Sequence, residues 1–176
     1  MIVLGAVALA ATVQAGTFKW STTVGQYIWA AGGETKLNAS YTAYLFDAGT
    51  ISQAAIVTAF TGSGIDFSKA MDSTAVSSTG TIAAKSLDVT ASQAYNMYLV
   101  IVDGDNVYIG PEKAASGPGE GKTSNVYFAT TTSSKLAAVT TGYNGAGWYT
   151  ASVPEPTSGL LLLLGVAGLA LKRRRV

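Results

Sequence analysis

The chain has 176 residues, with eleven basic and ten acidic residues, a formal net charge of +1, and neither cysteine nor histidine. The missing cysteine excludes disulfides and thiolate metal sites, and the missing histidine removes the commonest general base and the commonest metal ligand. Residues 16–152 hold seven lysines against nine acidic residues, a net charge of −2, so this part has no basic excess with which to bind nucleic acid. The length fits one modest domain.

The first fifteen residues, MIVLGAVALAATVQA, form an apolar segment ahead of a more polar body. Val13 and Ala15 place small residues as signal peptidase requires, so residues 1–15 predict a secretion signal cut between Ala15 and Gly16. The alternative is a buried strand or helix of the folded domain. No lysine or arginine precedes Ile2, although signals normally carry one, and we therefore expect the start codon to lie upstream.

Residues 16–152 favour a secreted, mostly β domain. Aromatic and β-branched residues, which suit strands, gather in runs separated by Ser-, Thr-, Gly- and Ala-rich connections at 73–81, 114–124 and 130–135. Short strands with such connections are typical of two-layer folds, so we predict a single β-sandwich or jelly-roll-like domain with one short helix. The predicted strands are Phe18–Trp29, Leu37–Phe46, Ala83–Val89, Tyr95–Val102, Val107–Ile109, Asn125–Thr130 and Trp148–Val153.

The predicted helix runs from Thr50 to Phe60. Thr50 lies three residues ahead of Gln53, which fits a capping box, and apolar residues recur at helical spacing until Gly62 and Gly64 end the pattern. We expect this helix to cover an open end or edge of a sheet. The side chains that should face the sheets are those of Ile51, Ile56 and Phe60.

Asp103-Gly104-Asp105-Asn106 separates two β-branched runs and predicts a hairpin turn. Asp103, Asp105 and Asn106 are also candidate calcium ligands, because hard cations prefer several oxygen ligands. The glutamate that completes a twelve-residue calcium loop is missing, and Asx-rich turns are common without an ion. We therefore predict a turn and no metal site.

Two other segments suggest enzymatic sites but favour structural roles. Ser116–Thr123 is similar to the end of a P-loop, yet it has serine where that motif needs glycine and precedes a predicted strand where it needs a helix. Asp47 and Asp88 could serve a glycosidase, but nothing in the sequence brings them together. A serine nucleophile would need another base in place of histidine, and no local signature marks one. We predict no catalytic residue and no cofactor.

Aromatic side chains are the remaining candidates for a binding site. Exposed rings could stack on sugars, but aromatic residues in β domains more often form the core. The candidates are Trp20, Tyr27, Trp29, Tyr41, Tyr44, Tyr143, Trp148 and Tyr149.

From Val153 the chain reads VPEPTSGLLLLLGVAGLALKRRRV. The thirteen uncharged residues from Gly159 to Leu171 would rise about 20 Å as a helix, against a hydrocarbon core of about 30 Å. Four adjacent cations cannot be buried in a soluble core, whereas they suit the cytoplasmic side of a bilayer and can reach outward from a short segment. Residues 153–176 therefore predict a transmembrane helix that ends in a cytoplasmic basic cluster. The cluster comprises Lys172, Arg173, Arg174 and Arg175.

Together the Val153-Pro154-Glu155-Pro156 stretch, the apolar helix and the basic cluster resemble the PEP-CTERM protein-sorting signal, over about the last two dozen residues. That family occurs in Gram-negative bacteria that make exopolysaccharide. The resemblance implies that an exosortase, a membrane cysteine transpeptidase, recognises and removes the tail and passes the body to the cell surface or matrix. It implies nothing about the activity of the body. The alternative is a permanent single-span anchor.

Three functional hypotheses follow. The first is a non-enzymatic surface or matrix protein that crosses the inner membrane, is anchored there transiently by its tail, and has no nucleic-acid partner. The second is a carbohydrate-binding module or adhesin that retains exopolysaccharide, which an exposed row of aromatic rings would favour. The third is a secreted hydrolase, which a cleft with two facing carboxylates would favour.

Overall fold

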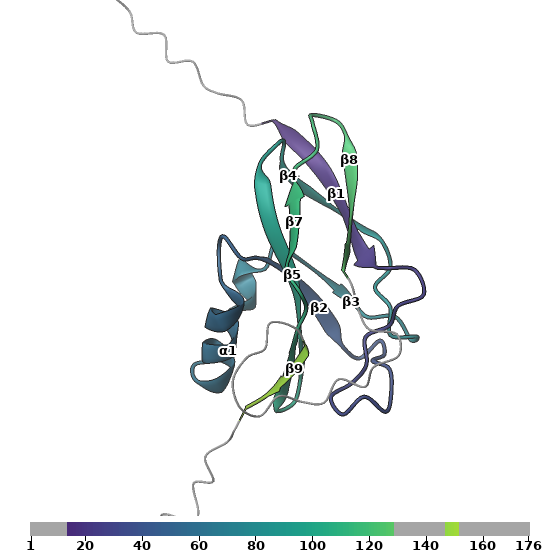
Figure 1. The fold of residues 1–176 in the computed structure, drawn as a ribbon, viewed down its shortest axis with the longest axis vertical. Coiled ribbons are helices and arrows are strands. Elements are labelled where there is room, and N and C mark those ends of the chain that lie inside the picture. Colours follow the sequence, from purple (N-terminus) through teal and green to yellow (C-terminus); the bar gives the residue numbers. More distant parts are fainter. Residues whose placement is uncertain (1–13, 129–146, 152–176) are drawn as a thin grey trace, which may run out of the picture.

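The computed structural model describes residues 14–128 and 147–151, which form a mostly β body with two sheets and one α-helix, as the sequence predicted (Figure 1). In chain order the elements are β1 (Ala15–Thr22), β2 (Thr42–Asp47), α1 (Gln53–Thr61), the 3-10 turn η1 (Phe67–Lys69), β3 (Asp72–Ala75), β4 (Lys85–Thr90), β5 (Ala94–Asp103), β6 (Asn106–Ile109), β7 (Lys113–Ser116), β8 (Thr123–Phe128) and β9 (Gly147–Thr150).

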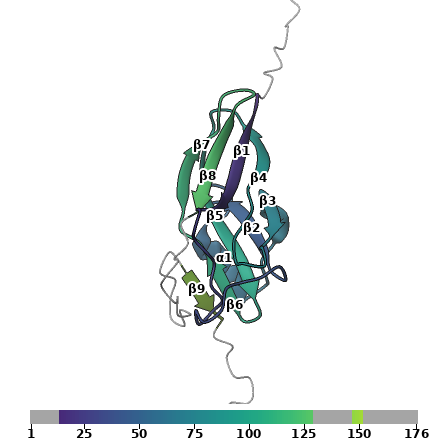
Figure 2. The same ribbon diagram turned by 90° about the vertical axis from the view of Figure 1, so that its right-hand side faces the viewer.

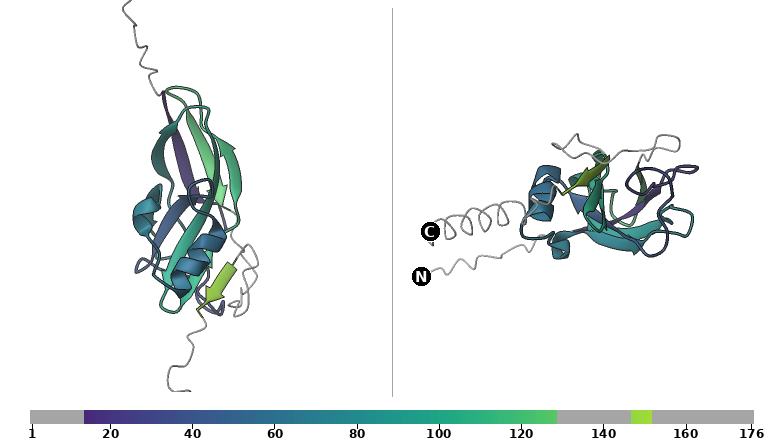
Figure 3. Two further views of the ribbon diagram at one scale, coloured as in Figure 1. Left: turned by 90° about the vertical axis from the view of Figure 1, so that its left-hand side faces the viewer. Right: turned by 90° about the horizontal axis from the view of Figure 1, so that it is seen from below.

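The two sheets and the helix form three layers. The small sheet has the order β4-β1-β8, with β4 antiparallel and β8 parallel to β1. The large sheet has the order β3-β2-β5-β6-β9, and β7 also pairs with β5. Alternate residues of β5 reach opposite faces: Leu99 joins the core shared with the small sheet, and Val100 joins the cluster under α1. The large sheet is therefore the middle layer (Figures 2 and 3).

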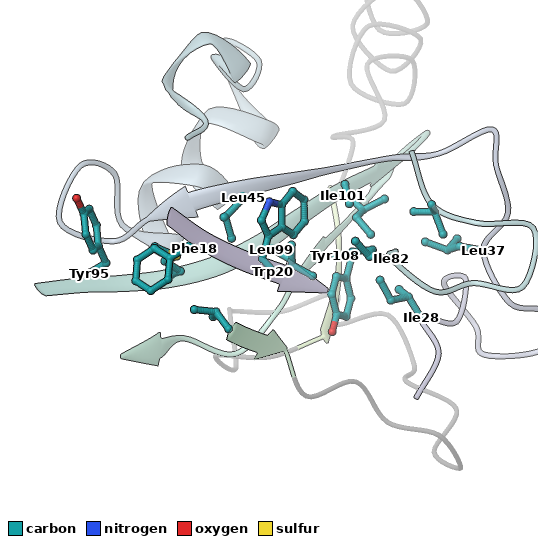
Figure 4. Close-up of a cluster of buried hydrophobic side chains, with 14 of the residues drawn as sticks. Phe18, Trp20, Ile28, Leu37, Leu45, Ile82, Tyr95, Leu99, Ile101 and Tyr108 are labelled. Atoms are coloured by element: carbon teal, nitrogen blue, oxygen red, sulfur yellow. The ribbon is translucent and has the colours of Figure 1, made fainter. Parts of the chain in front are cut away.

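The main core lies between the sheets. Phe18 and Trp20 of β1 are fully buried beside Leu45 and Leu99 of the large sheet (Figure 4). Residues from the connections close the rest of this core, where the small sheet does not reach. Those residues are Ile28, Leu37, Val76 and Ile82. Burying such side chains is the main favourable contribution to folding, about 1.5–3 kcal/mol for each large apolar residue.

Helix α1 begins later than predicted. Its N-cap is Ser52, whose side-chain oxygen accepts a hydrogen bond from the Ala55 N–H at 3.2 Å. The predicted capping box from Thr50 to Gln53 is wrong, because Gln53 is buried and its Nε2 donates to the Gly110 carbonyl at 2.7 Å. The glutamine thus ties the start of the helix to the end of β6.

The predicted face of the helix is confirmed, but its placement differs from the expectation. Ile56 is fully buried, and Ile51 and Phe60 are half-buried against the same cluster, which includes Phe46 and Tyr98 of the large sheet. The helix therefore covers the outer face of that sheet and does not sit at its end or edge (Figure 3). The strands β2 and β5 carry apolar side chains on both faces of the sheet. The face turned away from the small sheet is buried by α1.

Two strands were missed by the sequence analysis. β3 (DSTA) and β7 (KAAS) lie in segments that were predicted as connections at 73–81 and 114–124. Their small, half-exposed side chains show no apolar alternation, so composition alone resembles a loop. The predicted connection at 130–135 lies outside the described residues.

Two predicted strands were too long. β1 stops at Thr22 and β2 starts only at Thr42, and the intervening chain folds back through an isolated bridge between Trp29 and Lys36. Gly32 and Gly33 form the turn of this segment. Their φ values of +92° and +72° are ones that residues with a Cβ rarely adopt.

The first strand begins and the last strand ends at opposite ends of the body (Figure 1). Ala15 and Gly16, the residues of the predicted signal cleavage, pair with Thr90 and Val89, so a cut between them would leave β1 from Gly16 onward. Within residues 14–128 and 147–151, no helix is long and apolar enough to cross a membrane. The predicted signal up to Val13 and the predicted membrane segment lie outside the described residues.

Candidate functional site

The candidate site is the end of the body at which the tail leaves the fold. It consists of the β5–β6 turn and strand β9. Asp103 pairs with Asn106 across a two-residue loop in which Gly104 has φ of +55°, so the predicted hairpin turn is confirmed. β9 then pairs antiparallel with β6, with Thr150 opposite Asn106. The turn and the end of β9 therefore lie side by side.

Polar contacts fix the end of β9 to this turn. The Ala151 N–H donates to the Asp105 carbonyl at 3.0 Å, and the Thr150 hydroxyl lies 2.7 Å from Asn106 Oδ1. Two residues earlier, Trp148 is fully buried in the main core, and its Nε1 donates to the Trp29 carbonyl at 2.7 Å. The strand thus has a buried anchor at Trp148, and the end of the strand is attached by two polar contacts at Thr150 and Ala151.

Of the candidate calcium ligands, Asp103 and Asn106 each have a side-chain oxygen that accepts a hydrogen bond within the protein. The Tyr41 hydroxyl donates to Asp103 Oδ1 at 3.2 Å, while Asn106 Oδ1 accepts from Thr150. Burial, and then the neighbouring Asp103 carboxylate, raise the pKa of Tyr41, so its hydroxyl stays a donor at neutral pH. Among the described residues, no group of three or more acidic, histidine or cysteine side chains could hold a metal ion. The contacts of this turn hold the end of β9.

The carboxylates proposed for a glycosidase lie in different sheets. Asp47 ends β2, and its Oδ1 accepts from the Asn96 N–H at 2.9 Å. Asp88 lies in β4, and its Oδ1 accepts from the Thr17 hydroxyl at 3.3 Å. Each carboxylate braces its own pair of neighbouring strands, and the structure does not bring the two together.

Asp72 forms a polar cluster between the sheets that the sequence did not reveal. Its carboxylate accepts from Trp20 Nε1 at 2.8 Å and from Lys85 Nζ at 2.5 Å, which joins β1, β3 and β4. Burial alone would raise the pKa of Asp72, but the hydrogen bonds from Lys85, Trp20 and the Ser73 N–H together hold this pKa below its usual value. The carboxylate is therefore a charged brace between the two sheets.

Asp72→Asn should lower the free energy of unfolding at pH 7 by about 1–2 kcal/mol, a modest effect because Lys85 remains 41% exposed. A carboxyl group whose pKa is lowered in the folded state stabilises above its unfolded pKa of 3.8 and loses that contribution as the pH falls through its folded pKa. The difference between wild type and variant should therefore shrink below pH 3.8, as measured by urea unfolding across pH. Asp105→Asn, in the exposed turn, is the matched control and should change stability by less than about 0.5 kcal/mol. A difference in unfolding free energy between wild type and Asp72→Asn that does not change with pH would contradict the role of Asp72 as a charged brace.

The aromatic candidates do not form an exposed row in the part of the chain that the structure describes. Trp20 and Trp148 are fully buried, and Tyr44 stacks on Phe67 with ring centroids 4.0 Å apart. Tyr27 and Trp29 are half-buried, and Lys36 Nζ lies 3.4 Å from the centre of the Tyr27 ring. Tyr41 and Tyr149 are also half-buried, and Tyr143 lies outside the described residues.

The segment that resembled a P-loop is a connection between strands. β7 ends at Ser116 and β8 begins at Thr123, so a strand follows where a phosphate site would need a helix. A Cβ on Gly117 would approach the Thr90 carbonyl oxygen to 2.2 Å, and the Thr17 N–H donates to the Lys122 carbonyl at 3.0 Å. Glycine is needed at position 117 because the chain packs closely on the end of β4, which accounts for this glycine without a nucleotide.

Comparison with known families identifies the segment that follows the candidate site. Residues 152–175 match the family model of the PEP-CTERM protein-sorting motif, which confirms the resemblance of the tail. No curated protein matches the chain. The motif implies export and membrane-associated sorting toward the cell surface, with an exosortase as the processing partner. The chain thus joins a PEP-CTERM sorting motif directly to the last strand of a β-rich body.

Proposed function

We propose that this is a non-enzymatic protein of the cell surface or exopolysaccharide matrix, whose body is released from its membrane tail by an exosortase. The sorting motif at residues 152–175 is the observation that carries this proposal. The facing sheets support a sandwich-like body, and its acidic side chains Asp47, Asp72, Asp88 and Asp103 are engaged in contacts that brace strands and turns. The leader is removed by signal peptidase, and the body acts as a displayed structural domain.

Intact mass of the protein extracted from the cell surface tests this proposal. The mature form should lack the apolar run and the four terminal basic residues, so its charge should fall to −2, or to −3 if Glu155 stays. A strain without the exosortase should retain the full tail in its membrane fraction. A surface form that still includes residues 157–176 would identify a permanent anchor instead.

A hollow beside β1 and β8 favours glycan binding as a second candidate function. The hollow has a volume of about 380 Å³, and its lining includes four residues that carry hydroxyl groups, namely Ser21, Thr22, Thr23 and Thr81. Tyr127, at 45% exposure, contributes an aromatic surface to it. A ring for stacking beside several hydroxyls is the combination that suits a sugar.

Tyr127→Ala should weaken retention of the exported protein on purified exopolysaccharide by about fivefold or more, since an aromatic contact contributes about 1 kcal/mol. Affinity electrophoresis with exopolysaccharide in the gel measures this. Lys113→Ala, on the exposed strand β7, is the control and should migrate as wild type. Equal retention of all three proteins would remove this candidate.

A further inference from the structure

The sorting motif begins where the fold makes its last described hydrogen bond. The family match starts at residue 152, and Ala151 is still bound to the Asp105 carbonyl. Only Ser152 and Val153 separate Ala151 from Pro154, so three residue steps, at most about 11 Å, join the two. An enzyme that binds the Pro-Glu-Pro stretch therefore lies close to the end of β9.

The motif itself has few main-chain donors. Pro154 and Pro156 have no N–H, so an enzyme that hydrogen-bonds to the extended main chain gains further donors from residues on the N-terminal side of Pro154. The N–H of Ala151 is one of the nearest, and in the folded body it already donates to Asp105. One N–H does not serve both partners well, so an enzyme that takes the Ala151 N–H must first release it from Asp105.

The contacts of β9 allow its end to open without loss of the whole strand. In the described part of the chain β9 is the last strand in the order and pairs with β6 alone. Thr150 and Ala151 are held by two polar contacts near the surface, whereas Trp148 is fully buried. Opening can therefore stop between Trp148 and Thr150.

We propose that Thr150 and Ala151 belong to the segment that the exosortase engages, and that this strand end must leave β6 before the tail is removed. This inference rests on the proposed function. The folded body thereby limits how fast its own tail is processed, and Trp148 keeps the rest of β9 in the core during the step.

A disulfide between β6 and β9 tests the proposal. Thr150 faces Asn106, and the hydrogen bond from Ala151 to Asp105 in the next pair makes this a non-hydrogen-bonded pair. Such pairs have Cα atoms about 4.5 Å apart, within the range of about 4.4–6.8 Å that a disulfide requires. The chain has no cysteine, so in N106C/T150C only the introduced pair can form.

Oxidised N106C/T150C should accumulate as membrane-bound precursor, with its processed fraction reduced to that of a strain lacking the exosortase. Addition of a reductant should start processing, followed by intact mass over time. The single variant N106C, which loses the polar contact with Thr150 but cannot form the disulfide, should be processed at least as fast as wild type. Processing of the oxidised double variant at the wild-type rate would overturn the proposal.

Two further variants make the result specific. N96C/A114C places a disulfide between β5 and β7, away from β9. The Asn96 N–H donates to Asp47 and its carbonyl accepts from the Ala48 N–H, so Asn96 and Ala114 also form a non-hydrogen-bonded pair. This control should be processed normally when oxidised. A flexible Gly-Ser spacer of about eight residues after Ala151 should restore processing to oxidised N106C/T150C, because it supplies free chain for the enzyme. If the spacer fails to restore processing, the strand end is not the barrier. An unprocessed wild-type protein would instead contradict the proposed function itself.

Discussion

Replacement of Pro154, Glu155 and Pro156 by alanine should leave the protein as a full-length precursor in the inner membrane. Insertion depends on the apolar run and the basic cluster, which this change leaves intact. Proline has a fixed φ and no N–H and disfavours regular structure, whereas alanine is the best helix former, so the change removes both the side chains of the motif and their backbone preference. The enzyme would then lose the residues by which it recognises the tail. Intact mass of the membrane and surface fractions measures the outcome.

The body offers a matched control in Pro111 and Glu112, a second Pro-Glu pair that lies between β6 and β7. Glu112 is exposed and accepts a hydrogen bond from Asn96 Nδ2. Alanine at both positions should leave processing unchanged. If the Pro154, Glu155 and Pro156 variant also yields a normal mature form, the tail is removed without reading this motif.

The features predicted correctly from the sequence are those encoded by neighbouring residues. The turn at 103–106 combines a glycine with Asx residues between β-branched runs, and the helical face of Ile51, Ile56 and Phe60 repeats within one segment. The tail is likewise a local pattern, with two prolines, an apolar run and four cations in order. In each case a few adjacent residues determine the structure or the sorting.

The missed features depend on residues far apart in the chain. Asp72 meets Trp20 across 52 residues, and Thr150 meets Asn106 across 44. No local pattern marks such pairs, because the sheet order alone brings them together. Gln53 shows the converse error, in which a local pattern misleads. Its position fits a helix cap, but its side chain is buried and donates a hydrogen bond to the Gly110 carbonyl. The direct junction between β9 and the sorting motif is also visible only in the fold.

The junction lies at one end of the body. β1 starts at one end and β9 finishes at the other (Figure 1). The hollow lined by Ser21 and Tyr127 belongs to the small sheet and not to the turn beside the tail. The hollow proposed for glycans and the strand end proposed for processing are therefore separate regions of one small domain.

Trp148→Ala should lower the free energy of unfolding by about 3–5 kcal/mol, the usual loss for a large aromatic side chain removed from a core. The side chain is fully buried, its ring centre lies 5.6 Å from that of Tyr108, and its Nε1 donates to the Trp29 carbonyl. The change leaves a cavity and removes this donor, in a domain whose total stability is about 5–15 kcal/mol. Chemical unfolding of the full chain in mild detergent, followed by circular dichroism, measures the loss.

Val24→Ala is the control, because its side chain is 93% exposed and its loss should cost less than about 0.5 kcal/mol. Trp148→Phe should fall between the two, since it keeps part of the ring but not the hydrogen bond. A stability of Trp148→Ala within about 1 kcal/mol of wild type would show that β9 is not anchored in the core. Removal of the anchor also frees the strand end, so the surviving Trp148→Ala precursor should be processed no more slowly than wild type. Loss of this one side chain should therefore lower stability without slowing processing, because the same strand completes the fold and leads into the sorting motif.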